Sequence, residues 1–273
     1  MIAKCTQQLN NKFESGDDMN QEISIVTRGD DLASTSSANR AIYEGMTKGV
    51  LKNTSIMMNC PHTKEAAELF AGRKEFCIGL HANINAEWDD YKWPSILPRS
   101  EVPDLYDEAG NLFGDNSLLH ARKPDLEQIM AEVNAQLDLA TKTGFDIKYA
   151  DTHMGFTWVV DGLQDAFRSW GLRKGLVVGI PAVKHIRFER VPDSGEATVQ
   201  NLVAALKTLD AGLYILVGHP SFDDAETRQL YFKGVTGEMI AQERDADRLC
   251  FTHPDILKVY RDRGIRPTRY DEV

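Results

Sequence analysis

Short apolar runs and longer amphipathic stretches alternate along this chain. Residues 23–27 alternate apolar and β-branched side chains, which is typical of a short buried strand, and we expect this strand to stop at Gly29. Hydroxyl side chains at 34–37 offer N-caps for a helical pattern over 38–48. The same order follows downstream, with predicted strands at 54–59 and 76–80 and a predicted helix at 63–71.

The middle of the chain lacks this periodicity. Prolines and glycines punctuate residues 83–122, which also carry several aromatic side chains. Because aperiodic segments of this length inside a compact domain are usually functional, we expect a wall or lid over a site. Strand–helix alternation then returns, with predicted helices at 124–143, 163–170 and 197–209, predicted strands at 147–150, 176–180 and 213–217, and two final helices within 239–264.

This alternation indicates a parallel sheet with helical crossovers. About six such units without a break in composition favour a single α/β domain over residues 22–273, built as a closed or nearly closed barrel. A doubly wound open sheet is the alternative. Residues 1–21 are polar and cannot build an apolar face, so we expect a poorly ordered N-terminal extension.

Composition narrows the class of protein. The 273 residues include 42% hydrophobic and 26% charged side chains, the proportions of an ordinary globular protein. A net charge of −10 argues against a non-specific nucleic-acid binder, which needs a basic face. The N-terminus lacks the apolar core of a signal peptide, and no stretch has the ~18 apolar residues of a membrane span. We therefore expect a cytoplasmic protein without a membrane partner, whose four cysteines form no disulfide framework.

Side chains with metal-binding chemistry follow four of the predicted strands. Asp30 and Asp31 come after the first strand, and His81, His153 and His219 follow three later ones. In a parallel α/β fold the carboxyl ends of all strands lie at one face, so these side chains should converge. An Asp and two His leave open positions for water, the arrangement that a hydrolytic metal site requires. For the Asp pair, a solvated turn before a helix is the alternative.

Asp151 has two interpretations. It lies two residues before His153, where it could orient an imidazole that binds a metal. It could equally be a simple turn residue. The remaining histidines fall in turns or polar segments, where we expect them to face solvent: His62, His120, His185 and His253.

Five short motifs occur along the chain at 28–31 (RGDD), 54–59 (TSIMMN), 79–83 (GLHAN), 151–153 (DTH) and 218–220 (GHP). Their order and approximate spacing resemble those of the YdjC-like carbohydrate deacetylase family, over about residues 23–264. Residues 244–249 are a weaker match to that family's C-terminal segment. Each motif alone is unspecific, whereas the ordered series is specific.

The resemblance implies an incomplete or distorted β/α barrel with a divalent metal, Mg²⁺ or Zn²⁺. It also implies removal of acetyl groups from N-acetylated sugars, chitin-derived oligosaccharides included, as small-molecule substrates. Carried over by position, the resemblance makes Asp31, His81 and His153 the metal ligands. It makes Asp30 the base that acts on water at the metal, and His219 the acid or electrostatic partner across the substrate. Asp/His/His ligands suit zinc, although ligand type alone does not fix the metal.

The chain departs from the family pattern at two places. The family usually carries a second histidine two residues after the ligand histidine, whereas Met154 and Gly155 follow His153 here, which removes a polar group from the substrate pocket. The family usually has a pair such as Asn-Ala before the two aspartates, whereas this chain has Arg28 and Gly29. Arg28 could bind an anionic group of an acidic sugar or form a salt bridge at the barrel rim, and we favour the salt bridge.

Three tryptophans, Trp88, Trp93 and Trp158, could stack on sugar faces, with packing in a partly buried position as the alternative. Two other functions stay open: a metal-dependent hydrolase of another amide or ester, and a sugar-binding protein without turnover. Asp30 and His219 argue against the binding protein, because binding alone needs neither a base nor an acid. The sequence leaves open the sugar and the oligomeric state, a homodimer included.

Overall fold

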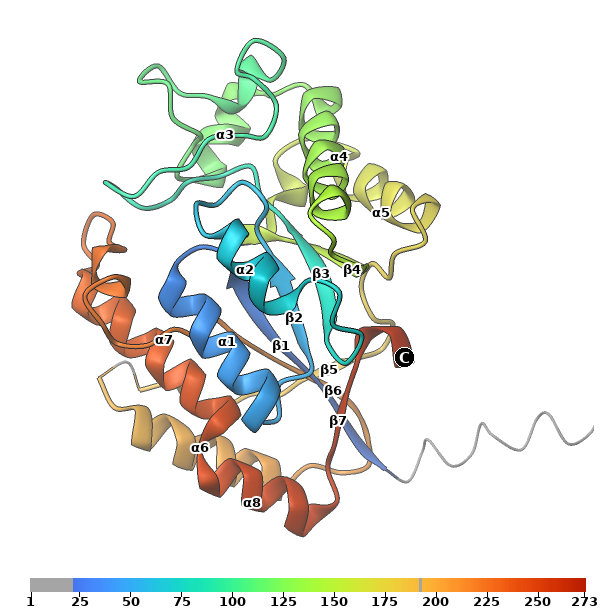
Figure 1. Ribbon diagram of the computed structural model, residues 1–273, viewed down its shortest axis with the longest axis vertical. Helices are drawn as coiled ribbons and strands as arrows, with labels where there is room; N and C mark the ends of the chain where they lie inside the picture. The colour runs from blue at the N-terminus through green and yellow to red at the C-terminus, as the bar shows by residue number, and fades with distance from the viewer. Residues whose placement is uncertain (1–21, 192) are drawn as a thin grey trace, which may run out of the picture.

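The computed structural model describes residues 22–191 and 193–273 and is organised around a seven-stranded sheet (Figure 1). The strand order is β4-β3-β2-β1-β6-β5, with β7 also paired to β1, and every pairing between these strands is parallel. The predicted N-terminal extension, residues 1–21, lies outside the described residues. The strands are β1 (Ile23–Leu32), β2 (Asn53–Ile56), β3 (Cys77–Ala82), β4 (Ile147–Thr152), β5 (Lys184–His185), β6 (Gly212–Gly218) and β7 (Arg266–Thr268).

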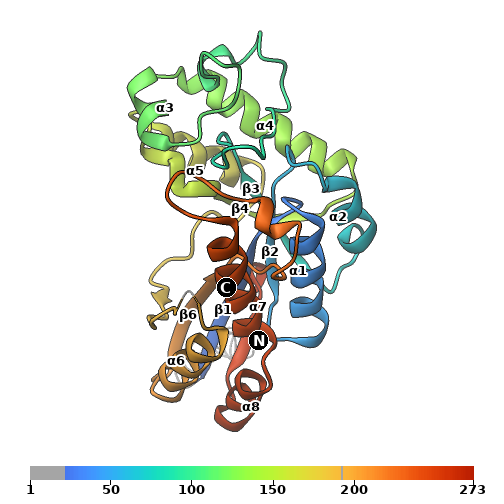
Figure 2. The ribbon, with the colours of Figure 1, turned by 90° about the vertical axis from the view of Figure 1, so that its left-hand side faces the viewer.

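Helices connect the strands and cover the outside of the sheet (Figure 2). Several begin where the sequence supplies a cap: the side chains of Thr35, Asp125 and Ser194 each accept a backbone N–H of the first turn. Within the described residues, no helix combines the length and apolar character that crossing a bilayer requires. The helices are α1 (Ser36–Lys48), α2 (Thr63–Phe70), α3 (Asn116–Arg122), α4 (Leu126–Lys142), α5 (Leu163–Arg173), α6 (Gly195–Lys207), α7 (Gly237–Thr252) and α8 (Pro254–Arg263).

The sheet forms an incomplete barrel, which confirms the predicted α/β class. The chain after α5 crosses from one edge toward the other: Val177 forms a single bridge to Tyr149 of β4, and β5 then pairs with β6. The predicted strand at 176–180 is therefore wrong. Gly179 and Ala182 have φ angles of 73° and 57°, and residues in this left-handed region interrupt an extended strand.

Strand β1 is longer than the sequence pattern predicts. It continues through Asp30 and Asp31 to Leu32 instead of stopping at Gly29. Gly29 serves close packing, because a Cβ at this position would lie 3.0 Å from Leu51 Cδ2 and 3.3 Å from Pro220 Cγ. Both aspartates thus belong to the strand end itself. Strand β7 and helix α3 were also missing from the sequence prediction, since each is short and carries no clear periodicity.

The inside of the incomplete barrel is filled by a small apolar cluster that includes two stacked tyrosines. The rings of Tyr149 and Tyr270 lie 3.9 Å apart at an angle of 9°. Gly79 of β3 faces the first ring, and a Cβ there would lie 2.3 Å from its atoms. A side chain at position 79 would therefore displace Tyr149, which contacts the polar groups described below.

We expect Gly79→Ala to lower the free energy of unfolding by about 1–3 kcal/mol, the usual cost of overpacking a core. Urea unfolding followed by circular dichroism measures this loss. Tyr149→Leu is the matched background, because it removes the ring that the new methyl group would meet. An equal cost of Gly79→Ala in both backgrounds would contradict the steric explanation.

Candidate metal centre

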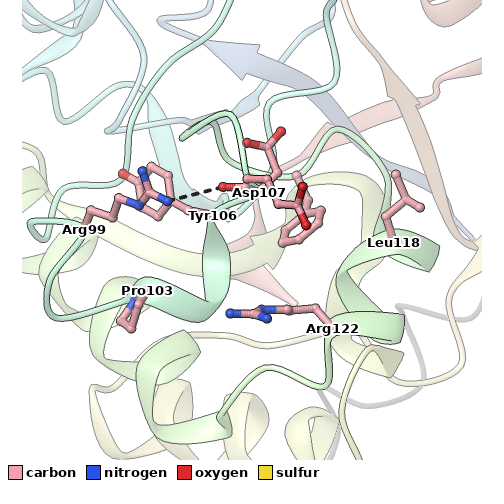
Figure 3. A pocket seen from close by; sticks show the side chains of 8 residues that line it. Arg99, Pro103, Tyr106, Asp107, Leu118 and Arg122 are labelled. Atoms are coloured by element: carbon pink, nitrogen blue, oxygen red, sulfur yellow. Dashed lines mark hydrogen bonds between the residues drawn. The ribbon is translucent and has the colours of Figure 1, made fainter.

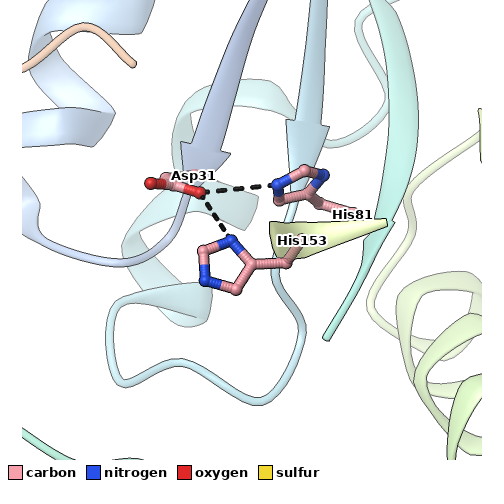
Figure 4. Close-up of side chains that lie close together, drawn as sticks. All are labelled: Asp31, His81 and His153. Carbon is pink, nitrogen blue, oxygen red and sulfur yellow. Dashed lines mark ion pairs between the residues drawn. The ribbon is translucent and has the colours of Figure 1, made fainter. Parts of the chain in front are cut away.

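The carboxyl ends of β1, β3 and β4 bring Asp31, His81 and His153 together (Figure 4). Asp31 Oδ1 lies 3.2 Å from His153 Nδ1 and 3.5 Å from His81 Nε2. The three residues are only 2%, 3% and 5% exposed. One ligand atom from each lies within 4.8 Å of the other two, a spacing that suits ligands of a single ion.

The backbone at Asp31 is strained. Its φ angle is 65°, and Ala33 has a φ angle of 80°. Such conformations cost about 1–3 kcal/mol each and persist only where neighbouring contacts fix them. Here the backbone N–H of Ser34 donates to the Asp31 carbonyl, and that of Ala33 donates to Asn39 Oδ1. This turn directs the Asp31 carboxylate toward the two histidines.

Carboxylates outnumber guanidinium groups around the two imidazoles by four to two. With neutral imidazoles, the buried cluster carries two net negative charges, which one divalent cation would balance. The donor set of one carboxylate and two imidazoles therefore fits a divalent metal in both charge and chemistry. The carboxylates are those of Asp30, Asp31, Glu87 and Asp151, and the guanidinium groups are those of Arg28 and Arg244.

The pKa of His153 reflects the same excess of negative charge. Burial lowers the pKa of His153, but the charges of Glu87 and Asp31 outweigh it and raise the pKa to about 10. Glu87 Oε2 lies 3.1 Å from His153 Nε2. Burial raises the pKa of Asp31, yet the charge of Arg244, 2.9 Å from Oδ2, holds this pKa well below its usual range. Asp31 is thus ionised and ready to bind a cation.

Asp30 and Asp151 are joined by Arg28. The guanidinium Nε and Nη2 lie 2.7 and 2.8 Å from the two Asp30 oxygens, and Nη1 lies 2.6 Å from Asp151 Oδ2. Asp151 Oδ1 lies 2.7 Å from His81 Nδ1, on the side of the ring away from Asp31. Arg28 therefore forms a salt bridge, the interpretation that we favoured from the sequence. Asp151 contacts His81 and not His153, which lies two residues away in the sequence.

His219 lies at the carboxyl end of β6, which pairs with β1, and its side chain is half-exposed. Its backbone N–H donates to Asp247 Oδ2 at 2.8 Å, and its Nδ1 lies 3.7 Å from the same oxygen. Desolvation by the surrounding protein lowers the pKa of His219 although half of the side chain is exposed, but the interaction with Asp247 and the charge of Asp31 outweigh it and raise the pKa. Arg190 Nε lies 2.9 Å from Asp247 Oδ1 and completes this group.

The three candidate tryptophans differ in exposure. Trp93 is buried and donates its Nε1–H to the Asn85 carbonyl at 2.6 Å. Trp88 is also buried and lies under the Arg244 guanidinium, 5.4 Å from its ring centroid. Trp158 is 53% exposed. Of these three side chains, only Trp158 leaves a ring face open to a ligand.

The segment 83–122 lies beyond the carboxyl ends of the strands in both views (Figures 1 and 2). It supplies Glu87 to the candidate metal centre, and Asn116 Nδ2 donates to the Met154 carbonyl next to His153. The segment also encloses a cavity of about 540 Å³ between Arg99 and Arg122 (Figure 3). The residues that line this cavity do not belong to the candidate metal centre. The segment therefore contacts the centre through Glu87 and Asn116, and not through the cavity.

Four charged residues of the site were missing from the sequence prediction: Glu87, Arg190, Arg244 and Asp247. Glu87 lies in the aperiodic segment, where no pattern marks it. Arg244 and Asp247 share the buried face of α7 with Ile240 and Phe251. A charge on the apolar face of an amphipathic helix is a signal that sequence reading can use.

With this geometry established, comparison with known proteins places the chain in a family. Residues 24–262 match the family described as YdjC-like protein, so the chain belongs to that family, as predicted. A protein named carbohydrate deacetylase from Thermoanaerobacter pseudethanolicus (strain ATCC 33223 / 39E) is 26% identical over 259 residues, 90% of this chain and 97% of that protein. Another protein of that name, from Geobacillus stearothermophilus, is 22% identical over 264 residues, 90% of this chain and 96% of that protein.

A solved structure supports the fold. A crystal structure from Enterococcus faecalis V583, of a protein named for cellobiose-phosphate cleavage, superposes with a TM-score of 0.73 at 20% identity. The match covers 92% of this chain and 98% of that one. At this identity the likeness concerns the fold, which the two proteins share over almost their whole lengths.

We expect Asp31→Asn and His153→Ala to reduce bound metal at least about tenfold, because each opens the coordination shell of a site with three protein ligands. Elemental analysis after dialysis against trace zinc measures the occupancy. His120→Ala, at an exposed histidine outside the cluster, is the control. Full occupancy in a folded Asp31→Asn or His153→Ala protein would refute the assignment.

Proposed function

We propose that this protein is a metal-dependent carbohydrate deacetylase that hydrolyses the acetamide of an N-acetylated sugar, with Mg²⁺ or Zn²⁺ as the cofactor. One observation carries the proposal: the buried cluster of Asp31, His81 and His153 adjoins an ion-paired carboxylate, Asp30, and interacts through Asp31 with a carboxylate-linked imidazole, His219. The names of the relatives support a carbohydrate substrate.

Asp31, His81 and His153 would hold the cation. Two imidazoles and a carboxylate suit zinc, and the remaining positions are open to water and substrate. When bound there, a divalent ion would supply a Lewis acid that lowers the pKa of water toward about 7. Asp151 would fix the His81 tautomer, because it accepts a hydrogen bond from Nδ1–H and leaves Nε2 free.

Asp30 would accept the proton of the attacking water. It neighbours Asp31 along β1, but its carboxylate faces Arg28 and stays out of the ligand cluster. Its side chain is buried, and one hydrogen bond from Arg28 Nη2 together with the nearby charge of Nε orients the carboxylate. Each oxygen keeps a second lone pair, so the contact leaves Asp30 able to accept a proton.

His219 would donate a proton to the departing amine. Its raised pKa keeps the imidazolium populated closer to neutral pH, as a general acid requires. Asp247 would hold the ring and stabilise its charged form. The open face of Trp158, which ends the short helical stretch that begins at His153, offers a stacking surface for a sugar ring.

We expect Asp30→Asn and His219→Ala to keep the metal and to bind an N-acetylated chitooligosaccharide. Each should lower kcat by about 10²–10⁴-fold, the range expected on losing a general base or acid. Acetate release and ligand titration on metal-loaded protein measure the two effects.

The same assay separates the other functions. Sugar binding by the wild type without acetate release from any N-acetylated sugar would favour a binding protein. Turnover of other amides or esters alone would favour a different hydrolase. Unchanged turnover in both variants would remove the roles given to Asp30 and His219.

The pH profile of kcat tests the link between Asp247 and His219. Asp247 raises the pKa of His219, so Asp247→Asn should lower that pKa and move the alkaline limb of the profile to lower pH. Activity should therefore decline at a lower pH in the variant, while the acidic limb set by the base stays in place. An unmoved alkaline limb would show that His219 is not the titrating acid.

A further inference from the structure

Arg28 lies inside a second group of cation ligands that adjoins the proposed metal centre. Asp30, His81 and Asp151 also offer one ligand atom each, all within 4.8 Å of one another. Three carboxylate oxygens of this group lie 2.6–2.8 Å from nitrogens of the Arg28 guanidinium. The guanidinium therefore occupies the place where a cation would bind these carboxylates.

The two groups share His81 and lie on opposite sides of its ring. His81 Nε2 faces Asp31 at 3.5 Å, and Nδ1 faces Asp151 at 2.7 Å. An imidazole can bind one cation through each nitrogen when both protons are lost. These side chains thus provide ligands for two cations, while one position already holds the fixed charge of Arg28.

Burial makes this charge necessary. The side chains of Asp30 and Asp151 are 4% and 16% exposed, and two carboxylates beside one imidazole repel each other unless a cation compensates them. Arg28 also donates to Tyr270 Oη at 2.9 Å, and Ser55 Oγ donates to Asp151 Oδ2 at 2.9 Å. Asp30 Oδ2 and both Asp151 oxygens thus accept hydrogen bonds, whereas Asp30 Oδ1 is compensated by the charge of Arg28 Nε at 2.7 Å alone.

We infer that Arg28 takes the place of a second metal ion, so that the centre binds one divalent cation and Asp30 remains a base. The inference rests on the proposed function in one respect, that Asp31, His81 and His153 bind a metal. Arg28 acts through Asp30 and Asp151 and is a positioning residue. The presence of Arg28 therefore determines how many metal ions the centre binds.

Charge and geometry can be separated by the choice of substitution. Lysine keeps the positive charge but lacks the planar fork that contacts Asp30 with two nitrogens. Methionine and glutamine remove the charge and keep a side chain of comparable length. Arg28→Lys should therefore preserve the metal stoichiometry and lower kcat more than it changes KM, because Asp30 loses its fixed orientation.

The decisive experiment is saturation with Zn²⁺, removal of free ions by gel filtration, and elemental analysis. Wild type and Arg28→Lys should retain about one equivalent, and Arg28→Met and Arg28→Gln about two. Combining Arg28→Met with Asp30→Asn removes a ligand of the second position and should return the value to about one. In EDTA, Arg28→Met should melt below the wild type, and zinc should raise its Tm by more than it raises that of the wild type.

Two tight zinc ions in the wild type, or none, would overturn the inference without any variant. One equivalent in both Arg28→Met and Arg28→Gln would overturn it as well, with circular dichroism showing that at least one of them is folded. The proposed function can be refuted independently of the role of Arg28. One zinc in wild type and two in Arg28→Met, without acetate release from any sugar, would uphold the role of Arg28 and reject the deacetylase.

Discussion

Buried negative charge at the carboxyl ends of β1, β3 and β4 is the constraint on which the rest of the site depends. Four carboxylates surround two imidazoles, and each is held by a guanidinium group or an imidazole. Repulsion among them would be costly away from water unless cations compensate it. Arg244 and Arg28 supply part of that compensation, and one divalent cation would balance the two negative charges that remain.

Hydrogen bonds connect the core of the barrel to the charged residues of the site. Tyr149 and Tyr270 fill the barrel as a stacked pair, and their hydroxyl groups reach Ser55 and Arg28. Ser55 in turn donates to Asp151. Packing of the core therefore fixes the positions of the charged groups around the cluster.

The departures from the family pattern fall on opposite sides of the centre. Arg28 organises the buried side, where it joins two carboxylates. Met154 and Gly155 form the solvent side beyond His153, and both have positive φ angles, 53° and 61°. A Cβ at Gly155 would meet nothing within 4 Å. A side chain at position 155 would thus meet no other atom at its Cβ, although the positive φ angle disfavours any residue but glycine there.

The sequence by itself determined the α/β class, the parallel strands and the convergence of Asp31, His81 and His153, because parallel strands place their carboxyl ends at one edge. It also marked Arg28 as unusual. Only the tertiary structure decided which charges pair. Glu87 comes from an aperiodic segment, and Arg244 reaches Asp31 from a helix 213 positions away in the chain. Such pairings depend on how helices and loops pack around the sheet, and no local periodicity encodes that packing.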